Sequence, residues 1–434
     1  MMTPSPAGES DLREPVAGPA AAYRWYVLAI LMVTYAVHAM DRTIINVLLE
    51  PIRREFHLND SAMGLLTGLG YAIPFAIAGM PLGALIDRTN RKRLLAALVA
   101  TWSVFTALGG LARTYVTLLV TRMAVGAAES GSPPAALSLI SDFFPARLRA
   151  TAVSIFYIGA PLGGMAGAYM GGVVTASHGW RTALFAAALP GLVMALVILA
   201  TVREPRRGGQ DAPRAVAEKV SFGAALKLAR NPGLACVLAA LVIGALASVG
   251  VGTWTPALLM RVYDVPVEDT GKLVALINLV GAGGTALGGM LSDLYAKGRT
   301  ERLLMLAGVT NLITIPPFLL AVLAPDLATF MPAFLAWSVL HVLYWGPGFS
   351  LALGLAPSQT RGRLMALTFV LSNILGAGMG PQIVGLLSDG FTLAGDAQGL
   401  RHAVACLSLA VAAAGALFLL AMRWVRPGVT EPIA

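Results

Sequence analysis

Long runs of apolar residues, separated by short polar stretches, recur roughly every 30 residues along almost the whole chain. A helix needs about 20 predominantly apolar residues to cross the hydrocarbon core of a bilayer. Dividing the chain at its polar and turn-forming stretches predicts twelve helices of this kind. We expect them near residues 25–49, 61–86, 94–112, 115–141, 149–176, 181–202, 233–260, 271–296, 302–323, 328–356, 362–388 and 400–425.

The composition also indicates a membrane protein. Of the 434 residues, 57% are hydrophobic and 12% are charged, and the mean hydropathy is +0.75. Soluble domains carry about 25% charged residues. The chain is therefore predicted to be an all-α membrane protein rather than a set of soluble domains. Cys236 and Cys406 fall inside predicted helices, which argues against a disulfide framework or a metal site.

The distribution of positive charge predicts the topology. A net charge of +9 would suggest a nucleic-acid partner in a soluble chain. Here, one set of alternate loops and tails holds 22 of the 31 lysines and arginines, and the opposite set holds seven. Positively charged loops remain on the cytoplasmic side of a membrane. We therefore expect a multi-pass protein of the plasma (inner) membrane with both termini in the cytoplasm, and no nucleic-acid partner.

The chain is predicted to consist of two similar halves. GALIDR at 83–88 resembles GMLSDL at 289–294, half a chain length later, which indicates an internal repeat. Two parallel halves of six helices are typical of transporters with a binding site at the membrane midplane. The predicted parts are a disordered cytoplasmic tail at 1–23, an N-terminal six-helix bundle at 24–202, a cytoplasmic linker at 203–232, a C-terminal six-helix bundle at 233–425 and a cytoplasmic tail at 426–434.

Ionisable residues are rare inside the predicted helices. Such a group costs at least ~2.5–3.5 kcal/mol at the membrane centre, so its presence indicates a function. The acids and arginines of this kind are confined to the predicted helices at 25–49 and 115–141. The whole set is His38, Asp41, Arg42, Arg122, Glu129 and His341.

The spacing of these residues predicts how they pair. Arg122 and Glu129 share one helical face but stand about 10.5 Å apart along the axis, too far for a direct hydrogen bond. Gly126 between them leaves a gap into which the first helix or a ligand can fit. Asp41 and Arg42 point about 100° apart. We therefore expect one ion pair between the two helices and one free group that faces a cavity.

Two interpretations of this cluster remain open. In the first, Asp41 and Glu129 bind and release a proton, while Arg42 and Arg122 alternately hold these carboxylates or a substrate headgroup. A carboxyl group favours its neutral form in apolar surroundings and its charged form beside a guanidinium. Movement from one environment to the other therefore makes it bind or release a proton. In the second, the four residues form a static buried network that only stabilises the bundle. His38 shares the helical face of Asp41 and can join either arrangement.

Several motifs resemble the major facilitator superfamily of transporters. GALIDRTNRKR at 83–93 is similar to the loop signature of that superfamily, and RMAVGAAE at 122–129 resembles its Arg-xxx-Gly element. Within the superfamily the chain most resembles the Spinster family of lysolipid and sphingolipid transporters, through MDR at 40–42, GAAES at 126–130 and FYIGAPLG at 156–163. The resemblance implies the all-α major facilitator fold, with twelve transmembrane helices in two six-helix bundles.

The resemblance also implies roles for particular residues. It places Asp41 and Arg42 in the substrate cavity and assigns Arg122 and Glu129 to proton-linked switching. Proton coupling is therefore expected to involve Asp41, Glu129 and Arg122. A conformational latch between the halves is implied for three residues of the loop after the second helix, namely Asp87, Arg88 and Arg91.

Substrate binding is expected to involve polar and aromatic residues of both halves. Tyr157 lies in the matched segment 156–163, and Trp254, Thr255 and Asn278 are candidates from the C-terminal half. Helix packing explains these C-terminal residues equally well. The predicted substrate-binding set is Arg42, Asp41, Glu129, Tyr157, Trp254, Thr255, Asn278 and His38.

The predicted function is secondary active transport of lysolipid or sphingolipid-like amphipathic molecules by alternating access, coupled to protons. A proton-linked drug exporter or a small organic-anion symporter of the same superfamily is the alternative, because a free arginine serves an anionic group in each case. An enzyme is not expected, since no catalytic triad spacing, metal cluster or phosphate-binding loop is visible. We expect a monomer without a cofactor, whose further partners are protons and membrane lipids.

Overall fold

The structure is a computed structural model, and its described residues are built almost entirely from helices. Some predicted parts lie outside these residues: the tail up to residue 20, the linker from 208 to 230, the tail from 425 and most of the start of the helix predicted at 362–388. The described residues are 21–207, 231–297, 299–355, 364, 367, 368 and 370–424.

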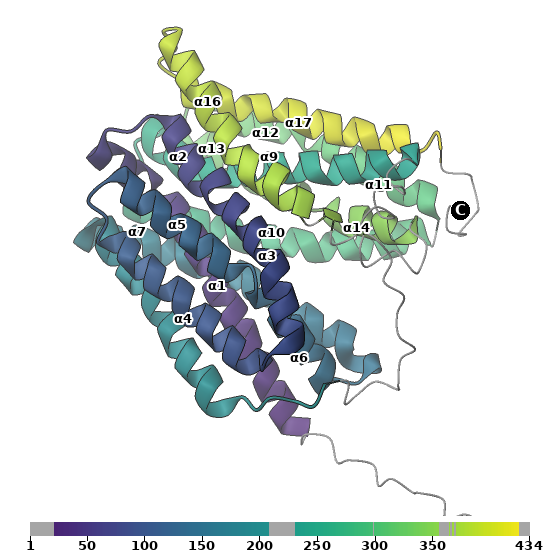
Figure 1. Ribbon diagram of the computed structural model, residues 1–434. Helices are drawn as coiled ribbons and strands as arrows, with labels where there is room; N and C mark the ends of the chain where they lie inside the picture. Colours follow the sequence, from purple (N-terminus) through teal and green to yellow (C-terminus); the bar gives the residue numbers. More distant parts are fainter. Residues whose placement is uncertain are drawn as a thin grey trace, which may run out of the picture.

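Helices α1 to α7 are called the N-half below, and helices α9 to α17 are called the C-half (Figure 1). The N-half contains α1 (Ala21–Phe56), α2 (Asp60–Thr67), α3 (Leu69–Arg88), α4 (Arg91–Gly110), α5 (Tyr115–Glu129), α6 (Ser132–Phe143) and α7 (Ala146–Thr201). The C-half contains α9 (Pro232–Val262), α10 (Val267–Ala296), α11 (Thr300–Ile313), α12 (Ile315–Val322), α13 (Leu327–Leu340), α14 (Trp345–Gly354), the π-helix η1 (Ser372–Gly378), α16 (Met379–Leu393) and α17 (Gly399–Ala421).

Nine helical segments within the described ranges are long and apolar enough to cross a membrane, and three of them each join two labelled helices, α2 with α3, α11 with α12 and α13 with α14. One of them, α7, has 56 residues and is broken at Gly179, whose φ of 79° and ψ of 164° are not helical. It therefore makes two crossings. Two further crossings are each divided into shorter pieces, α5 with α6 and η1 with α16. The prediction of twelve crossings is confirmed, and the chain is a multi-pass membrane protein.

Polar side chains mark the start of several crossings. Asn59, Asn90 and Asn231 accept backbone N–H groups from the first turns of α2, α4 and α9. Thr114 forms a reciprocal capping box with Thr117 at the start of α5. Such caps satisfy N–H groups that have no partner within the helix. Local sequence thus determines where these crossings begin.

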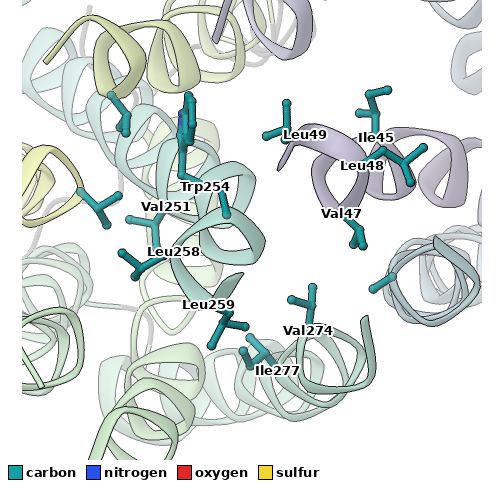
Figure 2. Packing of buried hydrophobic residues seen from close by; sticks show 14 of the residues in the cluster. Ile45, Val47, Leu48, Leu49, Val251, Trp254, Leu258, Leu259, Val274 and Ile277 are labelled. Carbon is teal, nitrogen blue, oxygen red and sulfur yellow. The ribbon is translucent and has the colours of Figure 1, made fainter. Parts of the chain in front are cut away.

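The apolar core is shared by the two halves at one end of the bundle and divided at the other. The end opposite the basic loops, where α1 leads to α2 and α9 to α10, is called the far end below. It holds one cluster that includes Ile45 of α1, Leu258 of α9 and Ile277 of α10 (Figure 2). The basic end, which carries the loops at 88–91 and 143–146, holds two clusters, one in each half. The halves accordingly diverge from the far end towards the basic end (Figure 1).

Glycines spaced four residues apart let α7 approach α1 closely. A Cβ atom at Gly163 would lie 1.9 Å from the carbonyl oxygen of Ala36, and Cβ atoms at Gly159 and Gly167 would meet other α1 carbonyls at 2.4 and 2.5 Å. Residues without a side chain permit this separation of two transmembrane backbones. The contact holds α1, and with it Asp41, firmly within the N-half.

Replacing Gly163 with alanine is expected to lower the thermal stability of the purified protein. The new methyl group overlaps the Ala36 carbonyl, and overpacking of this kind costs about 1–3 kcal/mol. Gly289→Ala in α10 is the matched control, because no heavy atom lies within 4 Å of the added Cβ. Thermal unfolding in detergent, followed by tryptophan fluorescence, checks the difference. Equal midpoints for the two variants would contradict this account of the α1–α7 contact.

Candidate functional site

Two acids and two arginines gather inside the N-half. Asp41 of α1 and Arg122 of α5 form a buried ion pair, with 2.8 Å between Oδ2 and a guanidinium nitrogen. Thr106 of α4 donates its hydroxyl to the other oxygen of Asp41 at 2.6 Å. Both oxygens of this carboxylate are therefore occupied. The ion pair that the spacing predicts between these two helices is present.

Glu129, at the C-terminal end of α5, lies in different surroundings. It is fully buried and accepts a hydrogen bond from the hydroxyl of Tyr71 on α3 at 2.5 Å. His38 Nδ1 lies 3.7 Å from the same carboxylate oxygen. Within the described part of the chain, the other oxygen has no hydrogen-bond partner, and no guanidinium lies within 4.0 Å. An arginine thus holds one carboxylate, and a phenol holds the other.

Tyr71, which is not among the candidates predicted from the sequence, connects these groups. The Arg42 guanidinium lies 5.0 Å and the Arg122 guanidinium 5.5 Å from the centroid of its ring, so both make cation–π contacts. Gly126 permits this position, because a Cβ there would lie 2.5 Å from the Tyr71 carbonyl oxygen. Helix α3, rather than the first helix or a ligand, fills the gap beside Gly126. A phenol hydroxyl inside an apolar helix is the sequence signal that points to Tyr71.

Arg42 faces a cavity of about 270 Å³ that lies between the two halves. Among the described residues its guanidinium forms no ion pair within 4.0 Å and contacts the Tyr71 ring instead. Arg42 is therefore the free group that the spacing predicts. The N-half contributes polar residues to the lining, among them His38, Asn46 and Arg122. The C-half contributes smaller residues, namely Val249, Thr253 and Ala377.

A second cavity, of about 770 Å³, lies between α7 of the N-half and α9, α10 and α13 of the C-half. Ala160 lines both cavities, so the two abut. The walls of the second cavity are largely apolar, and the rings of His341 and Trp337 stack there with centroids 4.1 Å apart. Three residues of the predicted substrate-binding set line it, namely Tyr157, Thr255 and Asn278.

The other members of that predicted set lie in different places. His38 and Arg42 line the first cavity, whereas Asp41 and Glu129 are buried behind its wall. Trp254 is fully buried in the shared core of the far end and donates its indole N–H to the Pro381 carbonyl at 2.9 Å (Figure 2). The structure brings Trp254 into the lining of neither cavity.

The loop predicted to latch the halves is bound within the N-half in this conformation. Arg91 is buried and pairs with Asp142 of α6 and, at 2.8 Å, with Glu204 beyond α7. The side chains of Asp87 and Arg88 are exposed at the basic end, where the halves diverge. A latch through these residues requires a conformation in which the basic ends meet, so it stays a prediction.

Comparison with known proteins finds relatives along most of the chain. The family model named Major Facilitator Superfamily matches residues 31–381. An MFS-type efflux pump of Mycolicibacterium smegmatis is 29% identical over 418 residues, which cover 95% of this chain and 96% of the pump. Protein spinster homolog 1 of Homo sapiens is 31% identical over 84% of this chain and 72% of that protein. A sphingosine-1-phosphate transporter of Danio rerio is 28% identical over 81% and 73%.

A solved structure shares the overall arrangement. It is the crystal structure of a bacterial homolog of the human lysosomal transporter Spinster in an inward-facing and unoccupied conformation, and it matches with a TM-score of 0.86. The two chains are 27% identical, and the match covers 94% of this chain and 98% of the other. The likeness therefore extends over both halves.

Proposed function

Because the chain belongs to the Spinster family of the major facilitator superfamily, we propose that it moves lysolipid or sphingolipid-like molecules across the membrane by alternating access, coupled to protons. Proteins of this superfamily are transporters of small molecules and not enzymes. The observation that carries the proposal is the guanidinium of Arg42, which has no ion-pair partner among the described residues and faces a cavity that abuts a larger apolar cavity.

An amphipathic molecule with an anionic headgroup has the chemistry of the two abutting cavities. The headgroup binds beside Arg42, where a hydrogen bond to a charged group contributes about 1.5–3 kcal/mol. The acyl or sphingoid chain occupies the apolar cavity, where each buried CH₂ contributes about 0.8 kcal/mol. The hydrocarbon chain of the lipid therefore supplies most of the binding affinity, and Arg42 selects the headgroup. The similarity to a sphingosine-1-phosphate transporter supports this substrate class.

Export of hydrophobic drugs is the second candidate function. It rests on the similarity to an MFS-type efflux pump, which extends over 95% of this chain. A proton-linked exporter uses the same apolar cavity but gains nothing from a cation that selects an anionic headgroup. The exposure of Arg42 to the cavity therefore favours the lipid.

Proton coupling is proposed for Asp41, Glu129 and Arg122. Asp41 is held by Arg122 and Thr106, whereas Glu129 contacts a phenol and an imidazole and no guanidinium within the described residues. Such an arrangement lets one carboxyl group exchange a proton while the other stays paired. A static network would instead pair both acids with the two available arginines.

We propose that the basic end faces the cytoplasm, as the loop charges predict. Both termini of a monomer in the plasma membrane then lie in the cytoplasm, and the divergent halves give an inward-facing conformation. The bundles at 24–202 and 233–425 move as units, joined by the linker at 203–232. Asp87, Arg88 and Arg91 latch them when the basic ends close.

Uptake by reconstituted vesicles tests the proposed function. We expect vesicles with the protein to take up labelled lysophospholipid or sphingosine phosphate faster than empty vesicles, and a proton gradient to increase this uptake. A hydrophobic cation such as ethidium serves as the competing substrate. Uptake of ethidium with no uptake of either lipid would support the exporter and contradict the lipid proposal.

A further inference from the structure

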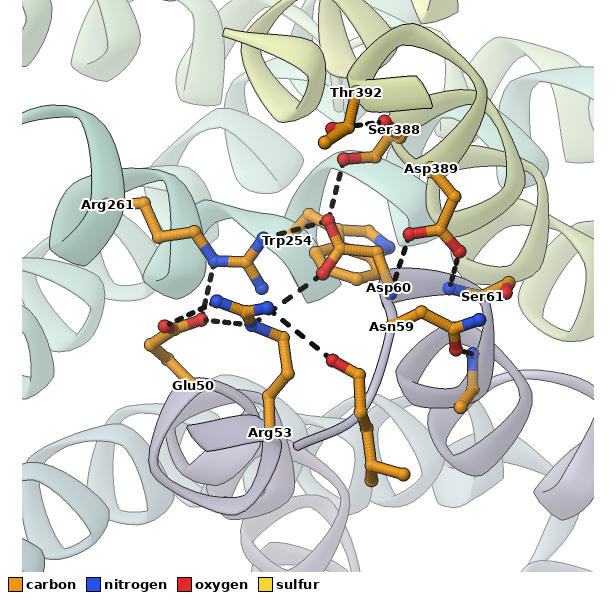
Figure 3. Close-up of polar contacts among 12 residues, drawn as sticks. Glu50, Arg53, Asn59, Asp60, Ser61, Trp254, Arg261, Ser388, Asp389 and Thr392 are labelled. Carbon is orange, nitrogen blue, oxygen red and sulfur yellow. Dashed lines mark hydrogen bonds and ion pairs between the residues drawn. The ribbon is translucent and has the colours of Figure 1, made fainter. Parts of the chain in front are cut away.

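Arg261, near the end of α9, reaches from the C-half to two acids of the N-half. Its Nε lies 2.5 Å from Glu50 of α1, and a terminal nitrogen lies 2.8 Å from Asp60 at the start of α2 (Figure 3). Arg53 and Arg54 also hold Glu50, at 3.2 and 2.8 Å. The N-half therefore presents Glu50 in a fixed position, and Arg53 lies 3.9 Å from Asp60 as well. Among the described residues of the C-half, Arg261 is the cation that pairs with both acids.

Asp389 of α16 forms a second connection, of a different kind. Its two carboxylate oxygens accept the backbone N–H groups of Asp60 at 2.9 Å and of Ser61 at 2.8 Å (Figure 3). These N–H groups begin α2, where no intrahelical partner exists and the helix dipole favours an anion. Ser388 adds a hydrogen bond from its hydroxyl to Asp60 at 2.6 Å. These donors belong to the backbone of the N-half, so only a proline at Asp60 or Ser61 would remove one of them.

Close backbone contact accompanies both connections. A Cβ at Gly385 would lie 2.4 Å from the Asp60 carbonyl oxygen, and one at Gly64 would lie 2.6 Å from that of Pro381. Helices α2 and α16 therefore touch directly at the far end. The side-chain hydrogen bonds that join the two halves within the described ranges lie at this end, while the halves diverge at the basic end.

We propose that Arg261 and Asp389 form a two-point clamp that keeps the far end closed, and that release of both points is required for the outward-open conformation. Arg261 supplies the cation at one point, and Asp389 supplies the anion at the α2 N-terminus at the other. The two points lie on different C-half helices, α9 and α16, so each resists opening by itself. This inference rests on the proposed alternating access but not on the identity of the substrate.

Distances between spin labels across the far end test the clamp in the full chain. The labels replace Arg113 in the loop before α5 and Leu393 at the end of α16, in a background with Cys236→Ser and Cys406→Ser. In nanodiscs we expect Arg261→Gln and Asp389→Asn each to raise the ratio of open to closed far ends at least tenfold, which corresponds to about 1.4 kcal/mol. The double variant should raise it further.

Two matched controls carry the same changes of charge at the same end of the C-half. Arg401 contacts Gln398, Tyr263 and Ala324 of its own half, and Asp396 accepts from His402 and the backbone of Gln398. Arg401→Gln and Asp396→Asn should leave the distance distribution unchanged. If Arg261→Gln and Asp389→Asn behave like these controls, the clamp is wrong.

Failure of the clamp and failure of alternating access give different results. An open population that appears with lysolipid but is insensitive to both substitutions contradicts the clamp alone. A single closed distance in every variant, with and without lysolipid, contradicts the proposed alternating access. If Arg261→Gln does not fold, Asp60→Asn tests the same point from the N-half, because it removes the charge that Arg261 holds.

Discussion

Replacing Glu129 with glutamine is expected to abolish the accumulation of lysolipid that a proton gradient drives. Glutamine preserves the size of the side chain and still accepts the hydrogen bond from Tyr71, but it cannot bind an exchangeable proton. One coupled proton and a gradient of two pH units supply about 2.8 kcal/mol, enough for about 100-fold accumulation. The wild-type protein should approach this ratio in proteoliposomes, and Glu129→Gln should only equilibrate the lipid.

Glu55→Gln is the control for this substitution. Glu55 lies in the N-half as well, but it pairs with Arg181 at the far end. It lines neither the cavity that Arg42 faces nor the apolar cavity that Tyr157 lines. The Glu55→Gln variant should accumulate lysolipid as the wild-type protein does. Gradient-driven accumulation by Glu129→Gln at the wild-type level would support the static network and exclude Glu129 as the proton carrier.

Replacing Arg42 with glutamine is expected to raise the apparent KM for an anionic lysolipid about 10- to 150-fold, with a smaller effect on kcat. This range follows from the loss of about 1.5–3 kcal/mol for a hydrogen bond to a charged group. Arg42 has no carboxylate partner among the described residues, so its removal leaves no buried anion unpaired. Initial rates of uptake at graded lipid concentrations check the change.

The headgroup of the lipid provides the control for Arg42. A lysolipid analogue with an uncharged headgroup should lose much less affinity, because it makes no charge-assisted contact. Arg181→Gln removes an arginine of the same half that pairs with Glu55. It should change the KM for neither the anionic lysolipid nor the uncharged analogue. An unchanged KM for the anionic lipid in Arg42→Gln would show that the headgroup binds elsewhere.

Patterns along single helices were sufficient to predict the crossings and part of the site. Twelve apolar runs correspond to twelve crossings, because a crossing needs about 20 apolar residues. Helix caps and glycines separate one run from the next. The pair between Asp41 and Arg122 follows from the scarcity of charge in the membrane, which leaves each group few partners. The free position of Arg42 follows from its 100° offset from Asp41, by helix geometry alone.

Contacts between distant segments were beyond the reach of these patterns. Tyr71 joins the site only because Gly126 lets α3 approach α5, and neither residue carries a charge that would mark it. By its position in the sequence, Arg261 is one of the seven basic residues on the less basic side, and nothing in its own helix points to Glu50, 211 residues away. Trp254 likewise fits a cavity and a core equally well by composition, and the structure places it in the core.

Movement of protons with the lipid is the most direct measure of the role proposed for the acids inside the membrane. Proteoliposomes with a weakly buffered lumen and a luminal pH dye would receive lysolipid without any imposed proton gradient. The luminal pH should change as the wild-type protein moves the lipid, and it should stay constant with Glu129→Gln while lipid still enters. Lipid entry through the wild-type protein with no change in luminal pH, or an equal change with Glu129→Gln, would contradict proton coupling through this site.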